Sequence, residues 1–289
     1  MEIIMTIING LSIGGTYAMI ALGYTMVYGI AKMLNFAHGD IIMVGGYTIV
    51  LFFPISPIVG IIASVIFCVT VGIVVERCAY KPLRGASPLA VLITAIGVSK
   101  LLQSTAQSLP FIGSKPKGIT YNFGNLQIGS VSISVLTLIT ILCSIAVMVG
   151  LTLFVKYTKT GRAMIAVSED RGAAQLMGIN VNFIIMITFI IGSALAAVAG
   201  VFLVFKIQDV GTTFGAMPGI KAFAAAVIGG IGSIPGAMAG GLVLGFIEAI
   251  CGMVPALSPY TDAIEFAILI LVLLVKPTGF LGKKRREKV

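Results

Sequence analysis

The chain has 289 residues, of which 58% are hydrophobic and only 10% are charged, and its mean hydropathy is +1.11. A soluble domain carries roughly 25% charged residues, so this composition excludes a protein that mostly faces water. The net charge of +9 does not indicate nucleic-acid binding, because the basic residues fall in short loops and in the C-terminal tail. Membrane proteins collect basic residues in such places for reasons of topology.

A helix that crosses a bilayer needs about 20 mostly apolar residues. Met1 and Glu2 lead directly into apolar sequence without the basic segment of a secretory signal, so we expect the first segment to remain as a span. Strong candidate spans lie at 3–30, 57–75, 88–109, 133–155, 183–205 and 260–276, and shorter ones at 38–53, 221–234 and 236–253. We therefore expect a single all-α integral membrane domain over residues 1–289, a polytopic bundle of about eight to ten helices, some short or discontinuous.

The basic residues predict the orientation of this bundle, since cytoplasmic loops carry an excess of Lys and Arg. Basic clusters lie at 77–84, at 156–171 and in the tail at 277–289. We expect all three on the cytoplasmic side, which makes the C-terminus cytoplasmic. The loop 110–132 then lies outside, and nine crossings place the N-terminus outside as well.

The segment 35–53 begins with polar residues and is interrupted by glycines. Asn35 is a candidate cap for the short apolar segment that follows. His38 is either a hydrogen-bonded polar residue near the cytoplasmic face or part of a gate, and Asp40 follows it in the same stretch. We treat Asn35, His38 and Asp40 as a candidate gating segment.

One face of the span 88–109 is polar. Lys100, Gln103, Ser104 and Gln107 recur there at helical spacing, so this face must look toward protein or water and not toward lipid. It is either a structural network in the bundle or a hydrophilic strip along a transport path. Glu248 and Glu265 are further intramembrane acids, and either could pair with Lys100.

The long loop 156–182 contains the pattern of a short amphipathic helix. Ser168 is a candidate N-cap, with Glu169 and Asp170 in the first turn, where acidic residues favour the positive end of the helix dipole. Gly178 can end the helix in a left-handed turn. Such a helix either lies on lipid or docks into a partner protein.

The stretch 219–245 is rich in glycine. Gly232, Gly236 and Gly240 recur at four-residue spacing, and Gly245 extends the series by one residue more, a pattern that lets helices approach closely. Pro235 interrupts the run, because proline lacks the N–H of a helix interior. Close helix packing and a discontinuous helix beside a translocation path both fit.

Catalytic and metal-binding motifs do not stand out in the sequence. The fragment Gly113–Gly118 does not complete a phosphate-binding loop, HExxH does not occur, and we expect no nucleophile elbow of the GxSxG type. His38 is the single histidine, and the four cysteines are scattered singly. We expect neither enzyme activity nor a cofactor in this chain.

Three blocks of residues carry a family resemblance. They are Gly14–Ala18 with Ala21–Tyr24 and Asn35–Asp40, then Gly161–Ala163 with Glu169–Ala174 and Gly178–Asn180, and last Ala225–Gly236. In this order they resemble the permeases of ATP-binding-cassette (ABC) importers, most closely those of the branched-chain amino-acid class.

The resemblance implies a prokaryotic inner-membrane permease that works by alternating access. Its partners would be a second, different permease chain, two cytoplasmic ATPase subunits that bind ATP and Mg²⁺, and a substrate-binding protein outside. The loop helix would couple the permease to the ATPase through Arg162, Glu169, Asp170, Ala173, Ala174 and Gly178. A permease for urea, short amides or sugars remains an alternative, as does a stand-alone ion-coupled transporter.

Overall fold

A computed structural model describes residues 2–113, 115–121, 123–128 and 131–282. In these residues, seven apolar helices are long enough to cross a membrane. They are α1 (Glu2–Ala31), α3 (Pro57–Val75, continued by irregular turns to Leu83), α4 (Pro88–Ser108), α5 (Val135–Tyr157), α8 (Val181–Ile207), α10 (Ile234–Met253) and α11 (Thr261–Val275, preceded by the turn Ser258–Tyr260). Two shorter apolar helices, α2 (His38–Phe52) and α9 (Ala216–Gly229), complete the bundle. The expected all-α polytopic membrane fold is confirmed.

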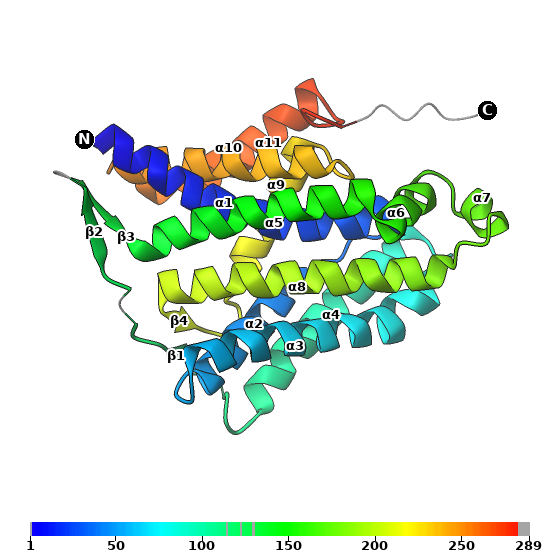
Figure 1. The fold of residues 1–289 in the computed structure, drawn as a ribbon, viewed down its shortest axis with the longest axis horizontal. Helices are drawn as coiled ribbons and strands as arrows, with labels where there is room; N and C mark the ends of the chain where they lie inside the picture. Colours follow the sequence, from blue (N-terminus) through cyan, green and yellow to red (C-terminus); the bar gives the residue numbers. More distant parts are fainter. Residues whose placement is uncertain (1, 114, 122, 129–130, 283–289) are drawn as a thin grey trace.

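The helices run side by side, and α1 lies in the middle of the bundle (Figure 1). It packs against α10, α8, α9 and α5, and α8 also contacts α2 and α3. From Ala18 to Leu22 the residues of α1 are fully buried. In contrast, α4 and α11 lie at the periphery and leave most of their surface open within this chain.

The two ends of the bundle carry different structures (Figure 1). At one end, α6 (Lys159–Glu169) and α7 (Arg171–Leu176) connect α5 to α8. At the other end lie the start of α1, the hairpin of β2 (Asn125–Ile128) and β3 (Val131–Ser134), and the antiparallel pair of β1 (Lys117–Gly118) and β4 (Asp209–Val210). The described parts of the loop 110–132 therefore lie at the end opposite to the loop 156–182, as the charge pattern predicts.

The glycine-rich stretch forms two helices and not one broken span. The chain turns at 230–233, where Gly230 and Gly232 have φ angles of +110° and +91° that favour glycine. Pro235 does not interrupt a helix. It lies in the first turn of α10, where its missing N–H costs nothing.

The segment after α11 turns back onto this junction. The N–H groups of Phe280 and Leu281 donate to the carbonyls of Ile228 and Gly229 at 2.8 and 2.9 Å. This contact places the end of the described chain, Gly282, beside the end of α9. The basic residues 283–289 of the expected cytoplasmic tail lie outside the described residues.

Candidate functional site

A cavity of about 1250 Å³ opens between six helices at the end of the bundle that carries the N-terminus. It is lined by the first half of α1, by the start of α5 and by the end of α8, and on the opposite side by α9, α10 and the start of α11. The polar residues of α1 that line it recur at helical spacing: Glu2, Thr6, Asn9, Ser12 and Thr16. A polar stripe on a membrane helix must face water or protein, and here it faces the cavity.

One wall of the cavity holds a cluster of charges around Lys221 of α9. Its Nζ lies 2.7 Å from Asp262 Oδ1, 3.2 Å from Glu248 Oε2 and 3.2 Å from Glu265 Oε2. The Tyr17 hydroxyl donates a hydrogen bond of 2.5 Å to the same Glu248 oxygen. One ammonium group therefore faces three carboxylates contributed by α10 and α11.

The three carboxylates differ in their access to the cavity. The Glu265 side chain is completely buried, whereas that of Glu248 is 25% exposed and that of Asp262 is 54% exposed. Glu265 Oε2 lies within ion-pair distance of Lys221, and Glu265 Oε1 has no hydrogen-bond partner among the described residues. Glu248 and Asp262 are thus the acids that a molecule in the cavity can reach.

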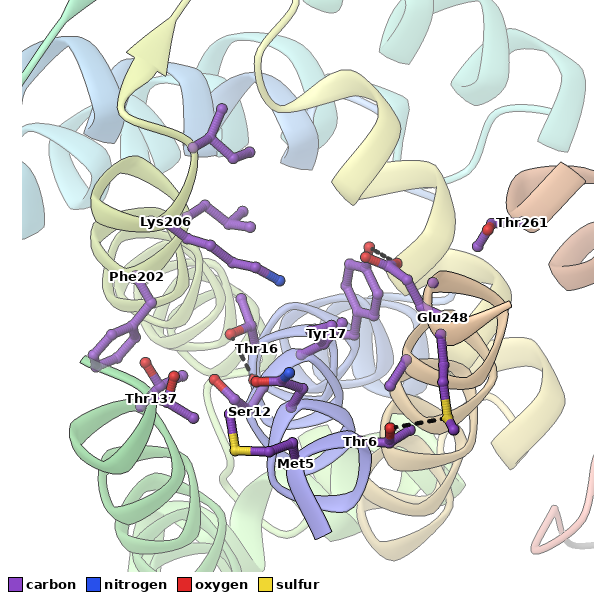
Figure 2. Close-up of a pocket in the computed structure, with 18 of the residues that line it drawn as sticks. Met5, Thr6, Ser12, Thr16, Tyr17, Thr137, Phe202, Lys206, Glu248 and Thr261 are labelled. Atoms are coloured by element: carbon purple, nitrogen blue, oxygen red, sulfur yellow. Dashed lines mark hydrogen bonds between the residues drawn. The ribbon is translucent and has the colours of Figure 1, made fainter. Parts of the chain in front are cut away.

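A second lysine lies on the opposite wall. Figure 2 shows Lys206 extending from the end of α8 into the cavity, across from Tyr17 and Glu248. Lys206 interacts electrostatically with Glu248, but the described part of the chain offers it no carboxylate within ion-pair distance. Phe202 and Leu203 form apolar wall beside it.

The expected pairing of Lys100 with Glu248 or Glu265 is wrong. Lys100 Nζ donates to Gln103 Oε1 at 3.1 Å, and both acids pair with Lys221. The reason is topological, since α4 lies beside α2 whereas α9 lies beside α10 and α11. Sequence spacing along α4 could not indicate which side of the bundle it occupies.

The polar face of α4 instead meets α2 and the loop that precedes α9. Gln103 Nε2 donates to Asp40 Oδ1 at 2.8 Å, and Gln107 Nε2 donates to Thr212 Oγ1 at 3.2 Å. Lys100 and Ser104 are exposed on this face. Asp40 is buried, so the contact with Gln103 supplies a partner for a carboxylate that lipid could not solvate.

Asn35 does not cap α2. The residue before α2 is Ala37, which has no side-chain oxygen, and Asn35 Oδ1 accepts a 2.9 Å hydrogen bond from the Tyr80 hydroxyl. His38 is buried with its edge against the Tyr24 ring, and its Nε2 has no hydrogen-bond partner within the described chain. Of the two interpretations of His38, the hydrogen-bonded residue is not supported at Nε2, and a role in gating stays a prediction.

The loop 156–182 folds into two helices where one was expected. Ser168 is not the cap: it lies in α6, and its hydroxyl donates to the Ile165 carbonyl at 2.7 Å. Asp170 is the N-cap of α7 and accepts a 3.0 Å hydrogen bond from the Ala173 N–H. Its extended backbone separates the two helices. Gly178 has a φ of +81°, the left-handed turn that the sequence predicts.

The proposed coupling residues differ in their exposure. Arg162, Glu169, Asp170, Ala173 and Gly178 are exposed, whereas Ala174 is buried against its own chain. Leu176 and Met177 at the tip of α7 are almost fully exposed. Arg171 points inward and donates to the carbonyls of Ile30 and Ala31 at the end of α1.

The glycines of the stretch 232–245 have two different roles. A Cβ at Gly240 would collide with the Ala225 carbonyl of α9, and one at Gly245 would collide with the Gly14 backbone of α1. Gly236 likewise packs against Gly229. Gly232 lies in the turn before α10 and has a positive φ, and it packs against Gly29 of α1, where an added Cβ would lie 3.3 Å from the Gly232 Cα.

One segment of α1 has the spacing of a GxSxG motif without its structure. Gly10, Ser12 and Gly14 have that spacing, but all three lie inside the continuous helix α1. A nucleophile elbow needs a sharp turn between a strand and a helix. Ser12 is therefore one of the polar residues of the cavity wall and does not have the setting of a catalytic serine.

Sequence reasoning missed Lys221, Asp262, Tyr17 and Lys206. A lysine in the apolar stretch 216–229 was a detectable signal, since intramembrane charges are rare and mark functional positions. The polar stripe of α1 was also visible in its spacing. The convergence of these residues on one cavity needed the packing of α9, α10 and α11.

Comparison with known proteins covers nearly the whole chain. Residues 6–273 match the family described as the permease component of branched-chain amino acid transport systems. The high-affinity branched-chain amino acid transport system permease protein BraD of Pseudomonas aeruginosa is 44% identical over 98% of this chain and 97% of its own length. The corresponding LivH protein of Escherichia coli is 42% identical over 97% of this chain and 96% of its own.

A solved structure of PsaBC from Streptococcus pneumoniae in complex with Fab covers 96% of this chain and 92% of that chain. Its identity of 17% and TM-score of 0.48 are low, so the description of the fold rests on the helices above. The family assignment rests on the sequence relatives. By these near full-length matches, the chain belongs to the family of permease components of branched-chain amino acid transport systems.

Proposed function

We propose that this chain moves branched-chain, aliphatic amino acids inward as one membrane-spanning subunit of an ATP-driven importer. The observation that carries the proposal is the similarity to BraD and LivH along nearly the whole chain. The chemistry agrees, because a cavity with charged walls and an apolar side suits a small molecule with two charged groups and an aliphatic side chain.

The proposed importer needs other chains, because this sequence has no phosphate-binding loop. Two cytoplasmic ATPase subunits would hold ATP and Mg²⁺, a different permease chain would pack beside this one, and an extracytoplasmic binding protein would deliver the substrate. The complex would lie in a prokaryotic inner membrane. The basic loops then put α6, α7 and the C-terminus in the cytoplasm and the cavity outside.

The structure supports an outward-open arrangement of this chain. The cavity follows α1 only as far as Tyr17, and beyond it the residues from Ala18 to Leu22 are completely buried. A molecule that enters the cavity therefore meets packed side chains halfway along α1. Alternating access requires this packing to open toward the cytoplasm while the cavity closes.

A connection from α7 to the cavity passes through α1. The exposed residues Leu176 and Met177, with Glu169 and Asp170 nearby, form the surface that we propose to dock on the ATPase. Arg171 joins α7 to the last carbonyls of α1. Because α1 is one continuous helix of 30 residues, displacement of its cytoplasmic end moves the polar stripe at its other end.

Reconstitution of the purified complex tests this function. The tagged chain is isolated with the proteins that accompany it, placed in liposomes, and supplied with binding protein and radiolabelled leucine. We expect uptake of leucine only with ATP, and the same result when radiolabelled isoleucine or valine replaces leucine. Uptake driven by an ion gradient without ATP would contradict the proposal, and uptake of urea or ribose but not leucine would contradict the substrate class.

A further inference from the structure

The charge cluster of the cavity is not balanced. Lys221 is the ion-pair partner of Glu248, Asp262 and Glu265, so one positive charge faces three negative ones. Glu265 is completely buried, and a buried carboxylate is stable only beside a compensating charge. The charge of Lys221 is therefore needed at Glu265, which leaves negative charge in excess at Glu248 and Asp262, on the side that faces the cavity.

The opposite wall has the opposite imbalance. Lys206 extends into the cavity from α8, and the described residues provide no carboxylate within ion-pair distance of it (Figure 2). A cationic group on one wall and surplus carboxylates on the other match a ligand that carries both charges. Phe202 and Leu203 on the Lys206 wall, and Ile13 on α1, provide apolar surface.

We infer that this cavity binds a free α-amino acid in a fixed orientation. Its ammonium group lies between Glu248 and Asp262, its carboxylate lies at Lys206, and its aliphatic side chain lies against Phe202 and Leu203. The inference rests on the proposed function and adds to it the residues that recognise each end of the substrate.

The same pair of charges occurs in a zwitterionic lipid headgroup. Phosphoethanolamine carries an ammonium and a phosphate, but it lacks an aliphatic side chain for the wall at Phe202. The test therefore includes phosphoethanolamine beside the amino acid, in nanodiscs built from phosphatidylcholine and phosphatidylglycerol.

The experiment measures protection of a cysteine placed in the cavity. The complete importer carries Thr137→Cys, on the α5 wall, in a background without native cysteines. Alkylation by a small thiol reagent is followed with increasing L-leucine, up to about 50 mM to cover weak binding. Leu126→Cys on β2, exposed outside the cavity, is the control and must show no protection.

The experiment compares three probes, L-leucine and two analogues, in the unsubstituted cavity and in the variants Lys206→Gln and Glu248→Gln. L-leucinamide lacks the carboxylate, and 4-methylpentanoate lacks the ammonium group. We expect leucine to protect the introduced cavity thiol at concentrations about tenfold or more below those of either analogue, because each lost charge-assisted contact weakens binding by that amount. In the Lys206→Gln variant, the leucine concentration needed for protection should rise to that needed for leucinamide. The leucinamide concentration needed for protection should not change.

Glu248→Gln provides the other half of the comparison. Its amide oxygen can still accept the hydrogen bond from Tyr17, so the wall keeps its shape while the charge is removed. We expect this variant to raise the protecting concentrations of leucine and leucinamide by the same factor. The protecting concentration of 4-methylpentanoate should not change. Such selective loss identifies which protein group meets which end of the ligand.

Several results would overturn the inference. They are no protection by leucine at any concentration, equal protection by leucine and both analogues, or losses in Lys206→Gln that are the same for all probes. Protection by phosphoethanolamine equal to that by leucine would assign the site to a lipid headgroup. ATP-dependent leucine uptake by the same unmodified complex separates these failures from failure of the proposed function, since it remains even if the cavity site is wrong.

Discussion

The charged side chains at the two ends of this molecule differ in how completely they are paired. At the end that carries α6 and α7, Arg84 pairs with Glu76 and bonds to Asn182, and Arg171 is held by two carbonyls of α1. At the cavity end, Lys221 is shared by three carboxylates and Lys206 points into open space. Paired charges hold one end together, as the proposed transmission of movement requires, whereas unbalanced charges at the other end leave room for the proposed ligand.

The largest effect should come from removing the centre of the cavity cluster. Lys221→Met leaves Glu265 buried without its cation, and breaking a buried pair in this way costs about 3–5 kcal/mol. We expect a marked loss of folded protein in detergent, measured as the thermal midpoint by size-exclusion chromatography. The double variant Lys221→Met with Glu265→Gln should recover much of this loss, and failure to do so would contradict the role of Glu265.

The next effect should come from the link between α7 and α1. Arg171→Ala removes the hydrogen bonds to the Ile30 and Ala31 carbonyls but no part of the exposed tip. We expect about tenfold slower leucine uptake, since hydrogen bonds to charged groups contribute about 1.5–3 kcal/mol, while the ATPase subunits still co-purify. Lys159→Ala, on the exposed side of α6, is the control for loss of a positive charge. Normal uptake by Arg171→Ala would remove α1 from the pathway of coupling.

A smaller change is expected from the tip of α7. Leu176 is 90% exposed, so Leu176→Glu should leave the thermal stability of this chain unchanged. It should lower the yield of ATPase subunits in the purified complex several-fold, because a charge replaces an apolar docking contact. An undiminished yield would show that the tip faces lipid or water and not a partner.

The smallest effect should come from α4. Gln103→Met removes the hydrogen bond to Asp40 but leaves Ser99 as a partner of that carboxylate, so we expect a loss of stability of about 1 kcal/mol or less, measured as a small fall in the thermal midpoint. Substrate selectivity should not change, since α4 does not line the cavity. A shift in the preference among leucine, isoleucine and valine would place α4 on the transport path after all.

The parts that depend on local pattern could be predicted from the sequence. Apolar runs predicted the helices, and Gly178 predicted the left-handed turn at the end of α7. The cap of α7 was misplaced by two residues, because Ser168 and Asp170 have the same capping chemistry and only the extended backbone of Asp170 decides between them. Gly232 has the four-residue spacing of the packing glycines, but it lies in a turn with a positive φ.

The parts that depend on contacts between distant segments could not be predicted. Asn35 meets Tyr80 and Glu248 meets Lys221, pairs separated by 45 and 27 residues. Periodicity shows that a polar residue must face protein or water, but it does not show which helix lies opposite. For this reason Glu248 and Glu265 were recognised as candidates while their partner Lys221 was not.

The proposed importer requires the cavity to face the exterior and the helices α6 and α7 to face the cytoplasm. Labelling of single cysteines in intact cells with a membrane-impermeant maleimide tests this orientation most directly, using Ser258→Cys at the cavity rim and Leu176→Cys at the tip of α7. We expect the Ser258→Cys variant to react in intact cells and the Leu176→Cys variant to react only after permeabilisation. Reaction of Leu176→Cys in intact cells, with Ser258→Cys protected, would contradict the account.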